Sequence, residues 1–168
     1  MISLPLVAAL ALSAASAEEE RVLDLLDRFF VALERADLNV MRSIVDENAD
    51  VTTLIPDNDG TVVVNTVTRD GWLAGLDGME GVIVELYWSP KVEISPIGLS
   101  HAWVPYVVEV NGKRSHCGVD AFTMVERPEG WRISDIHFTR DPSGCERLGL
   151  EDARGEMRPA ALRAKLKS

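Results

Sequence analysis

Cysteine and histidine are scarce in this chain, which has two cysteines and three histidines among 168 residues. They show no C-x-x-C, H-x-H or H-x-x-x-H spacing, so the sequence predicts no metal site. The glycine-rich signatures of phosphate-binding and dinucleotide-binding loops are missing, as is the G-x-S-x-G of hydrolases. We therefore expect no metal and no cofactor, and we exclude nucleotide-dependent and serine-hydrolase chemistry.

Two further absences concern partners. No apolar run reaches the roughly 18–20 residues that a helix needs to span a bilayer. Basic residues are also few, because 17 Lys and Arg face 27 Asp and Glu, for a net charge of −10. Since phosphate binding needs a basic surface, we exclude nucleic acid as a partner. The length and the 46% hydrophobic content instead fit one globular domain.

Charged side chains are absent from residues 1–17, and three glutamates follow at 18–20. Ala15-Ser16-Ala17 fits the small-x-small pattern that signal peptidase recognises, although no Lys or Arg precedes the apolar stretch. We predict that residues 1–17 are a signal peptide cleaved before Glu18, and that the protein is periplasmic or secreted. The alternative is that this segment forms a buried N-terminal helix or strand of the domain.

Export affects the expectation for Cys117 and Cys145. In an oxidising compartment two cysteines form a disulfide, whereas in a cytosol they stay reduced. A disulfide between them would close a loop of about 28 residues and contribute about 3–4 kcal/mol in the chain-entropy model. We therefore predict a Cys117–Cys145 disulfide in the exported protein, with a reactive thiol as the alternative.

The order of predicted elements indicates an α+β fold. Helix-like periodicity comes first along the chain, and strand-like segments follow it. We predict one domain at 18–145 and a basic C-terminal appendage at 146–168. Asn111-Gly112 predicts a tight hairpin turn, and Pro105 predicts a sheet edge or bulge. The predicted helices lie at 18–36, 37–45 and 70–76, and the predicted strands at 51–55, 61–66, 82–92, 102–110, 115–125 and 131–139.

Three segments resemble the nuclear transport factor 2-like superfamily, within its SnoaL-like branch. They are the first helix, the run "AD-LNVMRSIVDENADV" and the terminal hairpin "GVDAFTMVERPEGWRISDIHFTRD". The chain is also similar to exported bacterial proteins labelled lumazine-binding or SnoaL-like. The resemblance covers residues 18–145 and implies a cone-shaped fold, in which N-terminal helices cover one face of a strongly bent antiparallel sheet. It also implies a homodimer formed through the outer face of that sheet.

His116 and Asp120 are the candidate catalytic residues. Their even spacing within a predicted strand places both side chains on one face. An apolar cavity would raise the pKa of the Asp120 carboxyl, which would suit it for general acid or base chemistry with His116 as partner. SnoaL-like cyclases and ketosteroid isomerases are similar in using a pocket aspartate. The alternative is a pair on the sheet surface or at an interface, without catalysis.

The candidate ligand-binding residues are Arg140 and three residues in or beside the predicted strand at 102–110. The segment "IHFTR" resembles the end of the last strand in kinase-association relatives, so Arg140 is expected to bind a carboxylate or other anion. The alternative is a salt bridge at the rim. His101, Trp103 and Tyr106 would line a cavity for a flat ligand, or they simply pack in the core.

These residues lead to three hypotheses about function. The first is an exported pocket protein of the SnoaL-like class that binds a small apolar or aromatic ligand without strong catalysis. The second is an acid/base enzyme of the polyketide cyclase or ketosteroid isomerase type that uses Asp120 and His116. The third is a dimerisation or scaffold domain. Under all three, we expect a homodimer.

Overall fold

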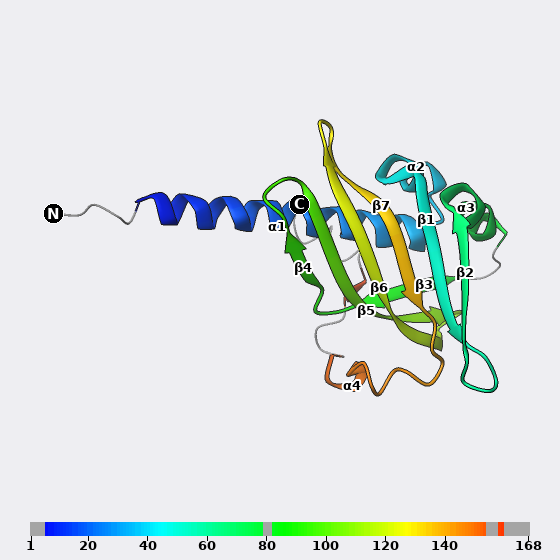
Figure 1. The fold of residues 1–168 in the computed structure, drawn as a ribbon. Helices are drawn as coiled ribbons and strands as arrows, with labels where there is room; N and C mark the ends of the chain where they lie inside the picture. The colour runs from blue at the N-terminus through cyan, green and yellow to red at the C-terminus, as the bar shows by residue number, and fades with distance from the viewer. Residues whose placement is uncertain (1–5, 79–81, 154–157, 160–168) are drawn as a thin grey trace.

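The computed structural model describes residues 6–78, 82–153 and 158–159. The first helix, α1 (Leu6–Glu34), lies along the sheet with its C-terminal half, while its N-terminal half extends past the sheet (Figure 1). The helix thus begins before the predicted residue 18. Its buried stripe faces the sheet and includes Val22, Leu25, Leu26, Phe29 and Phe30.

The second helix, α2 (Leu38–Ile44), begins as the sequence predicts. The Asp37 carboxylate accepts a hydrogen bond from the Val40 backbone N–H at 3.1 Å, which satisfies one of the free amides of the first turn. The chain then enters strand β1 (Val45–Pro56) directly. This strand begins six residues before the predicted 51, and its buried residues Val45, Ala49 and Val51 join the core.

A hairpin and a short helix follow, close to their predicted positions. The Asp57 carboxylate accepts hydrogen bonds from the backbone N–H groups of Asp59 and Thr61, which holds the turn before β2 (Val62–Thr68). The Thr68 hydroxyl then caps α3 (Arg69–Asp77). Strand β2 lies at one end of the sheet.

The predicted long strand at 82–92 is two strands, β3 (Ile83–Tyr87) and β4 (Lys91–Ile94), and Pro90 lies in the break between them. Both pair with β5 (Leu99–Val110), on either side of the break between them. Pro105 lies opposite this break, where its carbonyl accepts a bond from Trp88 N–H at 3.2 Å. The missing proline N–H therefore costs no ladder hydrogen bond, although β5 is an interior strand.

Two long hairpins complete the sheet. The residues of the predicted Asn111-Gly112 turn have φ values of 52° and 73°, as a tight type I′ turn requires, and they join β5 to β6 (Lys113–Arg127). A turn at Pro128-Glu129 leads into β7 (Gly130–Thr139).

The strands pair in the order β2-β1-β7-β6-β5-β3-β8, and β4 pairs with β5 outside this order (Figure 1). Strand β1 runs parallel to β7, while the other named pairs are antiparallel. The sheet is thus mixed, which corrects the expected antiparallel sheet, because the last long strand, β7, lies beside β1 and runs in the same direction. The α+β class is confirmed.

The segment after β7 folds back on the outer face of the sheet. Cys145 forms a disulfide with Cys117 of β6, with a Cα–Cα distance of 5.1 Å. Beyond it, Leu150 of α4 (Leu150–Ala153) is buried in a small cluster with Trp88 and Val107. Strand β8 (Arg158–Pro159) then pairs with β3. The described part of the predicted appendage is therefore attached to the sheet.

Candidate functional site

Strand register places several polar side chains on the inner face of the sheet, which faces α1. Asp120 pairs with Val104, and Glu85 pairs with Val108, and antiparallel partners point to the same side. Two residues beyond Glu85, Tyr87 donates its hydroxyl to the Asp27 carboxylate of α1. The inner face therefore carries carboxyl groups inside an otherwise apolar interior.

Asp120 and Glu85 are two coupled carboxyl groups, of which Asp120 is buried and Glu85 is half-buried. Asp120 is 5% exposed, and its Oδ2 accepts no hydrogen bond from any described residue. Each of the two carboxyl groups affects the pKa of the other. Burial raises the pKa of both groups, that of Glu85 to about 7, and the Glu85 charge raises that of Asp120 further. Such a pair holds a proton near neutral pH, because two adjacent buried carboxylates repel each other.

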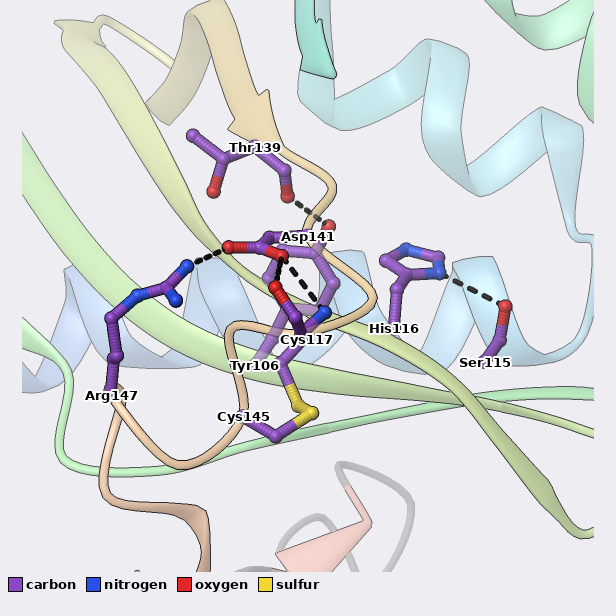
Figure 2. Close-up of a disulfide and its surroundings, with 9 residues drawn as sticks. Tyr106, Ser115, His116, Cys117, Thr139, Asp141, Cys145 and Arg147 are labelled. Atoms are coloured by element: carbon purple, nitrogen blue, oxygen red, sulfur yellow. Dashed lines mark hydrogen bonds and ion pairs between the residues drawn. A yellow bond between two sulfur atoms is a disulfide. The ribbon is translucent and has the colours of Figure 1, made fainter. Parts of the chain in front are cut away.

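His116 is not the hydrogen-bond partner of Asp120 that the sequence analysis expected. Its Nδ1 lies 3.1 Å from the Ser115 hydroxyl, and its ring meets the Tyr106 ring edge-on at 5.8 Å. The ring points away from the disulfide (Figure 2). Burial, assisted by the Arg140 charge, lowers the pKa of His116 to about 4, so the ring is neutral at physiological pH.

Tyr106 lies between these groups in a tightly packed part of the sheet. Its hydroxyl donates to the Thr139 carbonyl at 2.6 Å (Figure 2). This contact passes over Gly118, where a Cβ would lie 1.9 Å from the same carbonyl, so only glycine fits there. Burial raises the pKa of Tyr106, and the Asp120 and Glu85 charges add to the effect. Tyr106 thus stays a neutral donor.

Arg140 borders a pocket of about 290 Å³ at the end of β7. The pocket wall combines the β1–β2 hairpin with the segment anchored by the disulfide. Its lining residues are Leu54, Pro56, Val62, Gly118, Thr139, Arg140, Asp141, Gly144, Arg147 and Leu148. Arg147 is bound to the Asp141 carboxylate (Figure 2), whereas Arg140 has no carboxylate partner among the described residues. Arg140 is therefore available to bind an anion.

Trp103 and His101 lie on the outer face of the sheet, opposite Tyr106. Side chains alternate along a strand, so odd-numbered residues here point away from the even-numbered Tyr106. Trp103 is 53% exposed, and His101 lies 3.4 Å from the Thr123 hydroxyl. The structure thus separates the three residues that the sequence analysis grouped around one cavity, and their spacing already contained this signal.

Glu85 is the site residue that sequence analysis missed. It belongs to a short strand that reads as part of a longer apolar run, and nothing local indicates a partner. Only the pairing of β3 and β6 with opposite edges of β5 brings Glu85 and Asp120 together. A second pocket of about 490 Å³ lies on the α1–α2 side and includes Asp27. Among the described residues, no group of three or more His, Cys, Asp or Glu side chains is arranged to hold a metal ion.

Comparisons with known proteins concern the fold. No protein-family model matches the chain, and no curated protein matches it. A solved NTF2-like protein with a cystatin-like fold from Novosphingobium aromaticivorans superposes with a TM-score of 0.66 at 16% identity, covering 88% of this chain and 98% of that one. An NTF2-like protein of unknown function from Silicibacter pomeroyi gives 0.56 at 16% identity, covering 74% and 96%.

The CaMKII hub of S. rosetta is also similar, with a TM-score of 0.56 at 14% identity, covering 72% of this chain and 95% of the hub. The chain therefore has the NTF2-like fold, and the predicted cone-shaped architecture is confirmed. In the part of the chain that the structure describes, no helix is long and apolar enough to cross a membrane.

The buried carboxyl pair predicts how stability depends on pH. Raised pKa values stabilise the fold below the unfolded-state pKa, and this stability is lost as pH rises through about 7 for Glu85. We expect the free energy of unfolding to fall by on the order of 2 kcal/mol between pH 5 and pH 8. Asp120→Asn should flatten this slope, because one carboxyl is gone.

Urea denaturation at a series of pH values measures this slope. The exposed outer-face residue Glu93 provides the control, since Glu93→Gln removes a charge without touching the pair. The lowered pKa of His116 acts in the opposite direction, so between about pH 4 and 6.5 it offsets part of the stability change that the carboxyl groups cause. If Asp120→Asn kept the full wild-type slope above pH 5, the raised pKa of Asp120 would be contradicted, whereas the part of the slope that burial of Glu85 causes should remain.

Proposed function

We propose that this chain is an exported protein that binds a small apolar or aromatic ligand beside Arg140, without strong catalysis. The observation that carries the proposal is the pocket of about 290 Å³ with its arginine. Its volume is close to the low end of small-molecule sites, which run from about 300 to 1,000 Å³. Resemblance to the SnoaL-like branch and an NTF2-like fold support the same conclusion.

The chemistry of the pocket selects a ligand with one anionic group. Leu54, Pro56, Val62 and Leu148 offer apolar surface, and a planar guanidinium binds a carboxylate through two parallel hydrogen bonds. Because Arg140 has no carboxylate partner among the described residues, a ligand anion displaces no existing ion pair. The disulfide fixes one wall, which reduces the ordering cost of binding.

Benzoate is a suitable probe for this site. At a hundred times its dissociation constant it should stabilise the protein by about 2.7 kcal/mol, measured by thermal shift. Arg140→Gln should weaken benzoate affinity by about tenfold or more, because it removes a charge-assisted hydrogen bond. Arg114→Gln is the control, since that arginine is exposed near the β5–β6 turn. Equal affinities for all three proteins would refute binding at Arg140.

Acid/base catalysis is the second candidate function, and the buried Asp120 supports it. A carboxyl group with a raised pKa is able to donate or accept a proton near neutral pH. In this mechanism the acid/base partner of Asp120 is Glu85 and not His116. Following bound ligands over time by NMR separates the two functions, since only an enzyme would change the ligand, and Asp120→Asn would stop that change.

Export is part of the proposal and rests on two features. The uncharged segment 1–17 ends in a small-x-small pattern, and the structure contains a disulfide, which is typical of exported proteins. When the chain is expressed in a bacterium, we expect mass spectrometry of the mature protein to give a chain that starts at Glu18 and has no free thiol. A mass that includes residues 1–17 would contradict cleavage.

We also propose a homodimer formed through the outer face of the sheet. Trp103 is 53% and Leu99 is 41% exposed four residues apart on the outer side of β5, where they offer apolar surface to a second copy of the chain. The likeness to a CaMKII hub supports assembly by this fold. Light scattering should give twice the chain mass, and Trp103→Glu should halve it. The control Val63→Glu, on β2 at the far end of the sheet, should leave a dimer.

A further inference from the structure

We propose that the Arg140 site forms only while Cys117 and Cys145 are joined by their disulfide, so that the protein gains this site after export. The inference rests on the proposed function and adds the regulation of the same site. The disulfide ties one wall of the pocket to the sheet, and a cytosol keeps such thiols reduced. Oxidation outside the cytosol therefore completes the pocket.

Two parts of the chain line this pocket. The sheet supplies the first part, which includes Leu54 of β1 and Gly118 of β6. The segment that follows β7 supplies the second part, which includes Gly144, Arg147 and Leu148. The pocket has its observed shape only while this segment lies against the sheet.

Backbone hydrogen bonds attach the segment to the sheet at its start. Asp141 exchanges two backbone hydrogen bonds with Cys117 of β6, at 2.9 and 3.2 Å. Among the described residues, the backbone N–H groups of 144–150 donate within the segment, as in the bond from the Leu148 N–H to the Gly144 carbonyl at 3.1 Å. These bonds shape the segment, but they do not attach it to a strand.

Side-chain hydrogen bonds of the segment follow the same pattern. Ser143 donates to the Asp141 carboxylate through its N–H and through its hydroxyl, both at 2.8 Å. Arg147 donates to the other oxygen of that carboxylate (Figure 2). These contacts end inside the segment, so its attachment to the sheet depends on other groups.

The disulfide attaches the middle of the segment. Cys117 and Cys145 both belong to the small apolar cluster that contains Leu150. Each cysteine is also next to a residue that lines the pocket, Gly118 and Gly144 respectively. The bond therefore joins the two parts of the wall at the pocket itself.

Reduction leaves the wall in a long loop. The loop is then attached at Asp141 and, beyond the small cluster around Leu150, at β8, which pairs with β3. Residues between two such points regain conformational freedom when a cross-link between them is broken. A ligand binds only the molecules whose wall is in place, so its apparent affinity falls in proportion to their fraction.

Formation of the bond is a thiol–disulfide exchange with an oxidised dithiol carrier. The Cys145 thiolate attacks a carrier sulfur and forms a mixed disulfide, and one carrier thiolate leaves. The Cys117 thiolate then attacks the Cys145 sulfur, and the second carrier thiolate leaves. Two protein thiols are thereby oxidised, their two protons pass to the carrier, and the carrier disulfide is reduced to a dithiol.

Benzoate titration of the oxidised and the reduced protein tests this regulation. Isothermal titration calorimetry is run on the oxidised protein, after reduction with dithiothreitol, and after reoxidation with oxidised glutathione and desalting. We expect reduction to weaken benzoate binding by about tenfold or more and reoxidation to restore it. Cys145→Ala should bind as weakly as the reduced protein under all three conditions. Equal affinities of the oxidised and the reduced wild-type protein would overturn the proposal.

Hydrogen exchange shows whether reduction acts on the wall alone. The amides of Leu148 and Leu150 donate within the segment, so we expect both to exchange faster after reduction. Met41 of α2 is the control, because its N–H donates to the Asp37 carbonyl at 3.0 Å and should stay protected. If Met41 also lost its protection, the disulfide would hold the whole fold and not one wall, and the proposal would be wrong.

The outcomes distinguish this inference from the proposed function. If the oxidised protein binds no benzoate, or if Arg140→Gln binds it equally well, the proposed function fails. If the oxidised and the reduced protein bind benzoate equally and both depend on Arg140, only the redox regulation fails.

Discussion

The aromatic stripe of α1 packs against the inner face of the sheet, and the environment of every buried carboxyl depends on this contact. Phe30 stacks on Tyr87 with ring centroids 4.4 Å apart, and Phe29 meets Phe122 edge-on at 5.0 Å. These rings exclude water from the space between helix and sheet. Because that space has a low dielectric constant, an acid there has a raised pKa unless a cation or donor compensates it.

A second constraint acts at the end of β7, where the chain leaves the sheet. The Thr139 carbonyl turns toward Tyr106 over Gly118, and the disulfide anchors the following segment on the outer face. The same few residues therefore hold Tyr106 as a neutral donor and form one wall of the pocket beside Arg140. The Cys117–Cys145 bridge is adjacent to this pocket through Gly118 and Gly144. The disulfide that anchors this segment therefore also sets the position of one pocket wall.

Local structure is predictable from sequence where one chemical reason acts within a few residues. Asp37 and Thr68 cap helices because their side chains reach the free amides of the next turn, and Asn111-Gly112 turns because both residues accept a positive φ. The sequence predicted a sheet edge or bulge at Pro105, but β5 is an interior strand. Proline is tolerated there because the break between β3 and β4 lies opposite it. The parallel pairing of β1 with β7 has no local signal, because it joins strands about 80 residues apart.

The amino-acid sequence by itself determined the α+β class, the disulfide pair, the absence of nucleotide-binding motifs and the identity of Asp120 and Arg140 as candidate residues. Only the tertiary structure decided the partners of those residues. It paired Asp120 with Glu85, directed His116 to Ser115 and Tyr106, and moved Trp103 and His101 to the outer face. The physical reason is that hydrophobic periodicity and turn chemistry act over short stretches of chain. The environment of a carboxyl group instead depends on which strands lie beside it in space.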